Sequence, residues 1–455
     1  MMDSALRQYT DLFRQHRDLI DSQCAAPLNA LRDKAAAAIE AMTLPEKGSE
    51  DYHITSLREM LAPDWGVNLA RVPMRFNPAE SFRCGVPNLS TAQIYMFGDT
   101  CVVPEGSGIP SGQGVFAGSL AQAAREMPDT VARHYGRLAD LGNPVAALNT
   151  MLCQDGVMIY VPDGVRLERP LQLVSILRGD QPMMAVRRVL LVLGKGSEAK
   201  LLMCDHTQGG GSAGLMSLQV IEAYAGEGST LDIYDIEESS ERTSRLSSLY
   251  LRQQARSNVL LDGITLYNGT TRNEYRCDLD GEQASLRLMG LAIEDRDRHA
   301  DTYSCIRHNA PRCKTDELFK YVIDDTARGS FAGLIYVAPG AVKTEAYQSN
   351  RNVVGSPQAR MYSKPQLEIY NDDVKCSHGT ATGTFDDSQL FYMNARGLSD
   401  RRAKLLLKQA FMADVIDGVR LPALGDRLRQ LVERRFAGEE GHSCATCMAD
   451  CPTAK

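Results

Sequence analysis

The sequence contains little of what several common classes of protein require. It has a single tryptophan, and aromatic residues make up 6% of its 455 residues, which is few for an enzyme that stacks sugar rings on aromatic side chains. Acidic residues outnumber basic ones, 57 to 50, so nothing indicates a nucleic-acid or anionic-membrane ligand. The apolar runs, such as Val189–Leu193, are far too short to cross a bilayer.

Signals for export and for disulfide stabilisation are also lacking. The first four residues open a charged helical pattern without the apolar segment of a secretory signal. The 12 cysteines are scattered through apolar or turn sequence, unlike a secreted disulfide framework. We therefore expect a reduced, cytoplasmic protein that is long enough for two or three structural units.

Glycine-rich segments are present, but they do not have a nucleotide-binding pattern. Gly106–Gly114 and Gly209–Gly214 lack the Gly-Lys-Ser/Thr ending of a P-loop, and neither is set cleanly between a strand and a helix. We expect no nucleotide site in this chain, so any ATP chemistry must come from a partner.

Hydrophobic periodicity divides the chain into three regions and a tail. Residues 1–152 show mainly helical spacing. Residues 153–384 alternate short β-rich runs with Gly-containing turns. That spacing fits a sandwich, a barrel or a solenoid, and the pattern alone does not choose among them. Residues 385–437 return to helical spacing, and a Cys-rich tail, residues 438–455, follows.

Cys376 and His378 lie where the last strand pattern meets a loop of small residues. Because they are two positions apart, they point to the same face of an extended chain. A thiol beside an imidazole is either a nucleophile with its base or a pair of ligands for a soft or borderline metal. The plainer alternative is a turn-lining thiol and a surface histidine, and the residues alone leave these alternatives open.

Two other groups of residues suggest chemistry. Cys305, His308 and Cys313 are three potential ligands within nine residues, but their spacing is not that of a standard zinc or iron–sulfur site. A β-helix enzyme acting on polysaccharides needs several carboxylates on one face. The chain supplies carboxylates without a matched His or Arg constellation, at Asp232, Asp235, Glu237, Glu238, Asp324 and Asp325.

The tail presents a further candidate metal site. Cys444, Cys447 and Cys451 form C-x2-C-x3-C-P, the second half of a bacterial ferredoxin pattern, and His442 can supply a fourth ligand to zinc or a cluster. The chain would then be a stable metalloprotein. The alternative is a frayed, disordered terminus.

Longer motifs resemble a known family. KPQLEIYNDDVKCSHG (residues 364–379), followed by QLFYMNARGLS (389–399), resembles the signature of the SufD family, a component of the Suf iron–sulfur cluster assembly scaffold. PDGVRLERPLQL (162–173) and FAGLIYVAPGAVKTEAYQSNRNVV (331–354) are similar to it as well, so the resemblance covers nearly the whole chain. The related SufB subunit has a His-Glu-Ala-Thr pattern where this chain has Cys-Ser-His-Gly.

The resemblance implies a mainly β fold, with a right-handed parallel β-helix between N-terminal and C-terminal helical domains. It implies a non-catalytic subunit of a SufB–SufC–SufD scaffold that pairs with a SufB-like paralogue, or with itself in isolation. His378, and less strongly Cys376, would lie at that contact, where an iron–sulfur cluster is held transiently. The resemblance also implies that a flavin can join the complex, with no cofactor held stably by this chain alone.

The same resemblance implies that the C-terminal helices dock SufC, an ABC-type ATPase. An apolar helical face rimmed by charges suits such docking, although it also suits an intramolecular core. The residues expected to contribute to this docking are Tyr392, Arg396, Gly397, Leu398, Leu406 and Phe411.

Overall fold

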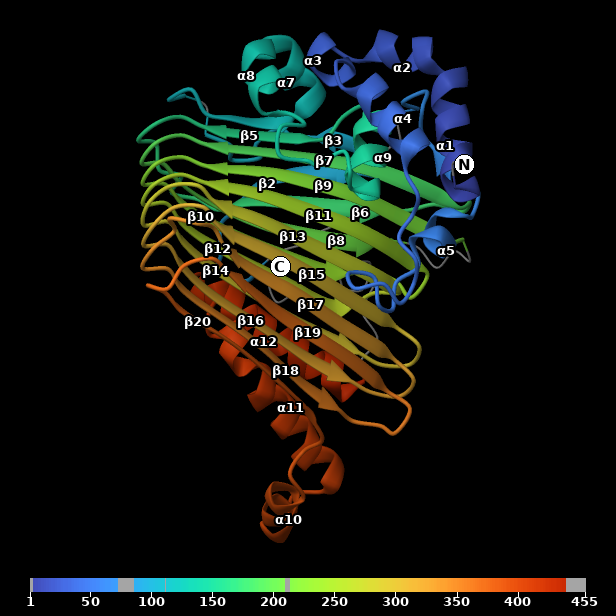
Figure 1. Cartoon of the computed structure of the whole chain (residues 1–455). Coiled ribbons are helices and arrows are strands. Elements are labelled where there is room, and N and C mark those ends of the chain that lie inside the picture. The colour runs from blue at the N-terminus through green and yellow to red at the C-terminus, as the bar shows by residue number, and fades with distance from the viewer. Residues whose placement is uncertain (1–2, 73–85, 111, 209–212, 439–455) are drawn as a thin grey trace.

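Two ten-stranded sheets form the body of the protein. The structure, a computed structural model, describes residues 3–72, 86–110, 112–208 and 213–438. Along most of the chain each strand pairs in parallel with the strand two positions later, so successive strands alternate between the sheets. The result is a parallel β-solenoid of about seven turns with helices at both ends of the sequence (Figure 1). The predicted parallel β-helix core between helical regions is confirmed.

The strands divide between the sheets as follows. Sheet A contains β1 (Gly66–Val67), β4 (Phe116–Ser119), β5 (Val157–Val161), β7 (Met183–Leu193), β9 (Leu215–Ala225), β11 (Thr243–Gln253), β13 (Thr270–Leu279), β15 (His299–His308), β17 (Arg328–Val337) and β19 (Arg360–Ile369). Sheet B contains β2 (Ala92–Phe97), β3 (Thr100–Val102), β6 (Leu171–Leu177), β8 (Glu198–Thr207), β10 (Thr230–Glu238), β12 (Asn258–Tyr267), β14 (Ser285–Glu294), β16 (Lys314–Ile323), β18 (Glu345–Val354) and β20 (Lys375–Gly383).

The N-terminal region contributes strands as well as helices. Strands β1 to β4 all precede residue 153, and β2 pairs with β6 while β4 pairs with β5. The pairing of β4 with β5 and of β2 with β3 is antiparallel, unlike the rest of the solenoid. The solenoid therefore begins before residue 153, where the sequence predicts mainly helix.

One corner of the solenoid repeats at every turn. A residue with positive φ recurs every 27 to 32 residues, and its N–H donates to a carbonyl of the next turn. Left-handed backbone of this kind makes a sharp corner and is least costly for glycine. The corner residues are Gly164, Gly196, Gly228, Arg256, Gln283, Arg312 and Lys343.

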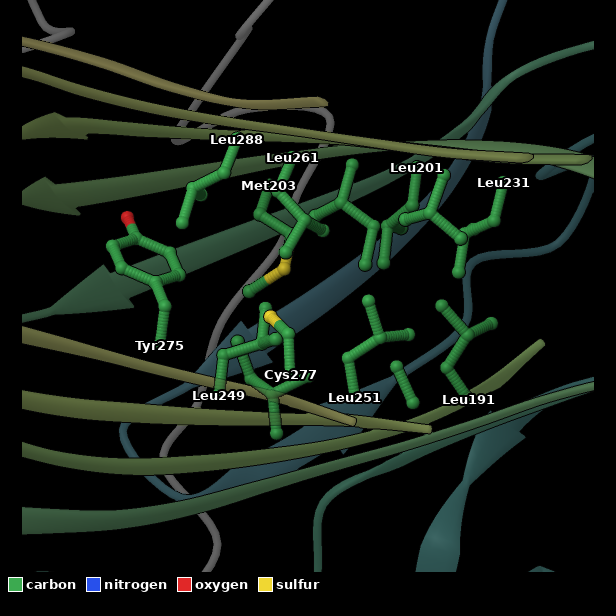
Figure 2. Close-up of a cluster of buried hydrophobic side chains, with 14 of the residues drawn as sticks. Leu191, Leu201, Met203, Leu231, Leu249, Leu251, Leu261, Tyr275, Cys277 and Leu288 are labelled. Carbon is green, nitrogen blue, oxygen red and sulfur yellow. The ribbon is translucent and has the colours of Figure 1, made fainter. Parts of the chain in front are cut away.

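The interior between the sheets is filled by alternate side chains of each strand. Figure 2 shows two of these rows, with Leu201, Leu261 and Leu288 from sheet B facing Leu249 and Leu251 from sheet A. Because the strand period is two, the residues between them face outward. Those outward residues are mostly buried too, since helices cover part of both outer faces.

The N-terminal helices pack on the outer face of sheet A. They meet apolar residues of β7, β9 and β11. A segment before α5 continues along the same face, where Thr55 donates to Asp301 (2.5 Å) and Glu50 pairs with Lys364 on β19 (2.7 Å). The helices are α1 (Ser4–Gln15), α2 (Arg17–Gln23), α3 (Ala26–Asn29), α4 (Arg32–Ala41), α5 (Leu57–Leu61), α7 (Leu120–Glu126), α8 (Pro128–His134) and α9 (Pro144–Leu152).

The C-terminal helices turn back onto the outer face of sheet B. They are α10 (Asp387–Ala395), α11 (Asp400–Ile416) and α12 (Pro422–Ala437). Apolar residues of α11 and α12 pack on β10, β12 and β14, whereas α10 projects beyond the solenoid (Figure 1). None of the helices in the described ranges combines the length and apolar character that a bilayer crossing requires.

Candidate functional site

The two ends of the solenoid differ. At the first end, antiparallel strands and helices complete the sheets. At the other end β19 and β20 are the outermost strands, and within the described residues no strand pairs with their outer edges. Unpaired edges offer a row of free N–H and C=O groups, which is a template for pairing with another chain. We call this end, formed by β19 and β20, the open end.

Cys376 and His378 both lie on β20 at the open end. They share one face of the strand, as their spacing predicts, and that face points toward the solenoid interior. Cys376 is half-buried against a cluster that includes Ile335 and Ala346, whereas His378 is exposed. The sequence-predicted pair is therefore placed at the rim of the interior.

The surroundings of Cys376 do not activate its thiol. Burial raises the pKa of the Cys376 thiol, and its hydrogen-bond partner is the backbone of Ala346 rather than the His378 ring. A raised thiol pKa disfavours the thiolate, which is the reactive and metal-binding form. In the chain by itself, His378 is the better placed of the two to meet an external group.

Polar side chains that sequence inspection missed surround this rim. Ser363 donates to the side-chain carbonyl of Asn350 (2.7 Å), and Thr380 donates to Ser363 (2.8 Å). Asn352 donates to Asn350 (2.7 Å) and to Thr382 (3.0 Å). The interior thus changes from apolar to amide and hydroxyl groups near the open end. The signal was present, because Gln348, Asn350 and Asn352 alternate along one strand.

The residues predicted for ATPase docking fall into two groups. On α10, Tyr392 is 60% exposed and its neighbour Phe391 is 75% exposed. No residue of this helix is buried. Arg396 stacks on the Tyr392 ring and Gly397 ends the helix, so both remain near the exposed tip. Leu398, Leu406 and Phe411 are half-buried, and Phe411 packs against the sheet B cluster.

Ion pairs fix the C-terminal helices to sheet B. Arg420 pairs with Asp232 (2.9 Å), and Lys320 pairs with Asp414 (2.5 Å). Lys408 pairs with Asp324 in the same way. Two of the carboxylates that a polysaccharide-active enzyme would use are therefore engaged in holding helices.

The remaining carboxylates do not converge with them. Asp235 faces the solenoid interior and accepts from Arg245 (2.6 Å), and Glu237 accepts from Thr271 (2.9 Å). Asp232 faces outward toward Arg420 on the opposite side of the same strand. Carboxylates on both faces of a sheet cannot act on one sugar, so these residues do not form a glycosidase-type site.

The Cys305, His308 and Cys313 segment is structural. Cys305 packs on the outer side of sheet A, whereas His308 lies inside and bonds to Thr315 (3.0 Å). Burial lowers the pKa of His308 to about 4. Cys313 donates to the carbonyl of Gly281 (3.2 Å) within the interior cluster. Among the described residues no three Cys, His, Asp or Glu side chains gather as a metal site.

The candidate metal ligands of the tail, His442, Cys444, Cys447 and Cys451, lie outside the described residues. A site there remains a prediction from the sequence.

Comparison with known proteins covers nearly the whole chain. The family model for "SUF system FeS cluster assembly, SufBD core domain" matches residues 175–411, and that for the "SufBD protein N-terminal region" matches residues 3–173. An iron–sulfur cluster assembly SufBD family protein of Synechocystis is 28% identical over 414 residues, covering 89% of this chain and 90% of that protein. The iron–sulfur cluster assembly protein SufD of Escherichia coli is 30% identical over 307 residues, covering 64% of this chain and 69% of that protein.

Proposed function

This chain belongs to the SufBD family of iron–sulfur cluster assembly proteins, and from that membership we propose that it is the SufD-type subunit of a SufB–SufC–SufD scaffold. It has no turnover of its own. It pairs with a SufB-like paralogue through the open end, and the nascent iron–sulfur cluster is cargo shared across that contact.

The observation that carries the proposal is that His378 lies at the rim of the interior, on a strand whose outer edge is unpaired among the described residues. A partner with the same kind of solenoid can continue both sheets through the free edges of β19 and β20. Pairing there encloses His378 between the two chains, where a neutral imidazole serves as a ligand to iron or accepts a proton from a partner thiol. A site divided between two chains also allows the cluster to be handed on.

The test compares His378→Ala with Ser377→Ala, a matched change to the exposed residue before it on the other face of β20. Each variant is co-expressed with the SufB and SufC counterparts and reconstituted anaerobically. We expect all complexes to assemble and iron and sulfide content to fall about tenfold or more only in His378→Ala, since even a contact that merely supports a metal ligand is worth about that much. Equal cluster content in both variants would show that His378 is not a site residue.

The exposed helix α10 is the proposed contact for the SufC-type ATPase. Phe391 and Tyr392 together present an apolar surface on a helix that buries none of its own residues. Large aromatic side chains at the centre of an interface often contribute most of its binding energy. When two ATPase subunits close on ATP, movement at α10 can reach the solenoid through α11 and its ion pairs with sheet B.

Replacing Phe391 and Tyr392 together by serine is expected to weaken ATPase binding by about 100-fold or more, since each is a candidate hot spot. Neither side chain is buried, so the thermal unfolding midpoint should not change. Binding is measured by calorimetry with the purified ATPase. The control, Leu424→Ala in the buried face of α12, should instead lower the unfolding midpoint. Retained affinity in the Phe391/Tyr392 variant would exclude α10 as the contact.

A further inference from the structure

A single column of side chains runs along the inner face of sheet B and ends at His378. Parallel register aligns one residue per strand from β6 to β20, so each lies above its predecessor. Five apolar residues come first and three polar residues follow. In order, the column is Leu171, Leu201, Ile233, Leu261, Leu288, Glu317, Gln348 and His378.

The first two polar members of the column are fully enclosed. Glu317 is 1% exposed and Gln348 is 2% exposed. The Gln348 amide Nε2 donates to Glu317 Oε2 (2.6 Å), and the Ser304 hydroxyl lies beside the same carboxyl group. No cation pairs with Glu317 among the described residues, and burial raises its pKa to about 7. Burying an acid and an amide next to the leucines of this column costs free energy unless their polar atoms are hydrogen-bonded.

The fold makes room for the Gln348 amide. A Cβ at Gly333 would lie 2.3 Å from Gln348 Nε2 and 2.9 Å from Ser304 Oγ. The absence of a side chain at Gly333 therefore allows the amide to extend over β17 toward Glu317. The amide's position therefore depends on two neighbours. Glu317 accepts its hydrogen bond, and Gly333 has no side chain that would collide with it.

Three side-chain atoms of this arrangement have no hydrogen-bond partner among the described residues, namely Ser304 Oγ, Glu317 Oε1 and Gln348 Oε1. The side-chain oxygen of Gln348 is buried and accepts no hydrogen bond from any described residue. A buried carbonyl without a donor costs about 1–3 kcal/mol. The next residue in the column is His378, on a strand about 4.8 Å away. Its ring carries an N–H donor in either neutral tautomer.

We propose that Gln348, held by Glu317, is a positioning residue for His378. The structure does not contain a hydrogen bond between these two side chains; when the His378 ring turns toward the interior, the side-chain oxygen of Gln348 accepts a hydrogen bond from one ring nitrogen, which selects one tautomer. The other ring nitrogen then presents its lone pair outward at the open end. Histidines that bind metals nearly always donate their second ring N–H to a fixed acceptor, which sets ring orientation and basicity. The inference rests on the proposed function, because it assigns the support of the same site.

The test uses the full chain with isotopically labelled histidine, whose eight residues are few enough to assign by comparison with His378→Ala. Nitrogen NMR of the ring reports the tautomer. We expect one dominant tautomer for His378 in the native chain and a mixture in Gln348→Met, which keeps the length but removes the acceptor. Gly333→Ala, which displaces the amide without altering it, should have the same effect. Asn352→Leu, in the adjacent polar network, should retain the native spectrum.

Cluster reconstitution with the partner subunits then separates the two hypotheses. Gln348→Met should lower cluster content about tenfold, the usual cost of losing such a supporting contact. An unchanged His378 spectrum in both Gln348→Met and Gly333→Ala overturns the positioning role, whatever the cluster content. The His378 spectrum can instead change in Gln348→Met and Gly333→Ala while cluster content stays at the native level in these variants and in His378→Ala. That result confirms the hydrogen bond but overturns the proposed role of His378.

Discussion

Glu222→Gln is expected to lower the free energy of unfolding by about 3–5 kcal/mol, the cost of leaving a buried charge unpaired. Glu222 on β9 and Arg188 on β7 form an ion pair in which both side chains are completely buried. Arg188 also donates to Asn149 of α9 (3.0 Å) and stacks on Tyr135. The pair therefore joins sheet A to the N-terminal helices, and its loss affects both.

The same carboxylate also holds the connection between α8 and α9. Glu222 accepts from the backbone N–H groups of Gly136 (2.7 Å), Leu138 (2.8 Å) and Ala139 (3.2 Å). Replacing both Arg188 and Glu222 by methionine removes the unpaired charge but leaves these three donors unsatisfied, so it should recover only part of the loss.

Urea denaturation followed by circular dichroism measures the change, and limited proteolysis between α8 and α9 shows where the structure opens. The matched control is Glu227→Gln, which removes a surface partner of Lys195 and should leave the urea midpoint unchanged. A native midpoint for Glu222→Gln would mean that the pair does not support the junction.

The solenoid was predicted only by resemblance, because what repeats from turn to turn is a backbone conformation and not a residue type. The first three corner residues are glycines, at 164, 196 and 228, but Arg256 and Gln283 adopt the same left-handed conformation later. A comparison of residue types therefore finds turns without a regular repeat. The conformation persists because each corner N–H bonds to the neighbouring turn, and that tertiary contact overrides local preference.

The period-two alternation of a β-strand predicted which residues share a face, which the spacing of β-rich runs along the chain did not. It placed Cys376 and His378 on one face, as the structure confirms. The same rule, once the strands are known, separates Cys305 from His308 and Asp232 from Asp235, since each pair is an odd number of residues apart. A local sequence pattern does not fix where a strand begins and ends, so these residues can be grouped as if they shared one face. Short strands β2 to β4 escaped prediction for a related reason, since they are stabilised by pairing with distant segments.

The candidate site depended on register, which no local pattern contains. His378 is adjacent to Gln348, 30 residues earlier, because every intervening turn closes with the same alignment. Glu317, 31 residues before Gln348, joins the column in the same way. Changes in turn length of a few residues between successive corners hide this alignment in the linear sequence.

Rising pH is expected to destabilise the protein, because burial disfavours the ionised form of several carboxyl groups. Burial raises the pKa of Glu237, Asp262 and Glu317 to about 7, and that of Glu294 to about 8. In the unfolded chain these groups ionise near pH 4. Above that pH the folded state binds more protons than the unfolded state, so their contribution to stability falls until the folded pKa is passed.

Buried histidines conceal part of this trend at lower pH. Burial lowers the pKa of His299 and His308 to about 4, so the unfolded state binds more protons at these two sites below about pH 6.5. Their contribution to stability rises with pH over that range and offsets part of the carboxyl effect. The net loss of stability should therefore be clearest between about pH 6.5 and pH 8.

Glu294→Gln isolates the effect, because an amide resembles the protonated acid and does not titrate. Its free energy of unfolding relative to the native chain should increase by about 1.4 kcal/mol for each pH unit between pH 4.5 and pH 8, as expected for one proton. Urea titrations at pH 5, 6, 7 and 8, roughly one unit apart, measure this pH dependence of the relative free energy of unfolding.

The control has the opposite sign. The Lys314 ammonium lowers the pKa of the Glu345 carboxylate at the surface, so Glu345→Gln should lose stability relative to the native chain as pH rises from the folded to the unfolded pKa, and the difference should then stay constant at higher pH. A relative stability of Glu294→Gln that does not vary with pH would show that Glu294 is ionised in the folded protein. The buried end of β14 would then contain a charge stabilised by Arg435 and Arg298, the two cations that favour its ionised form.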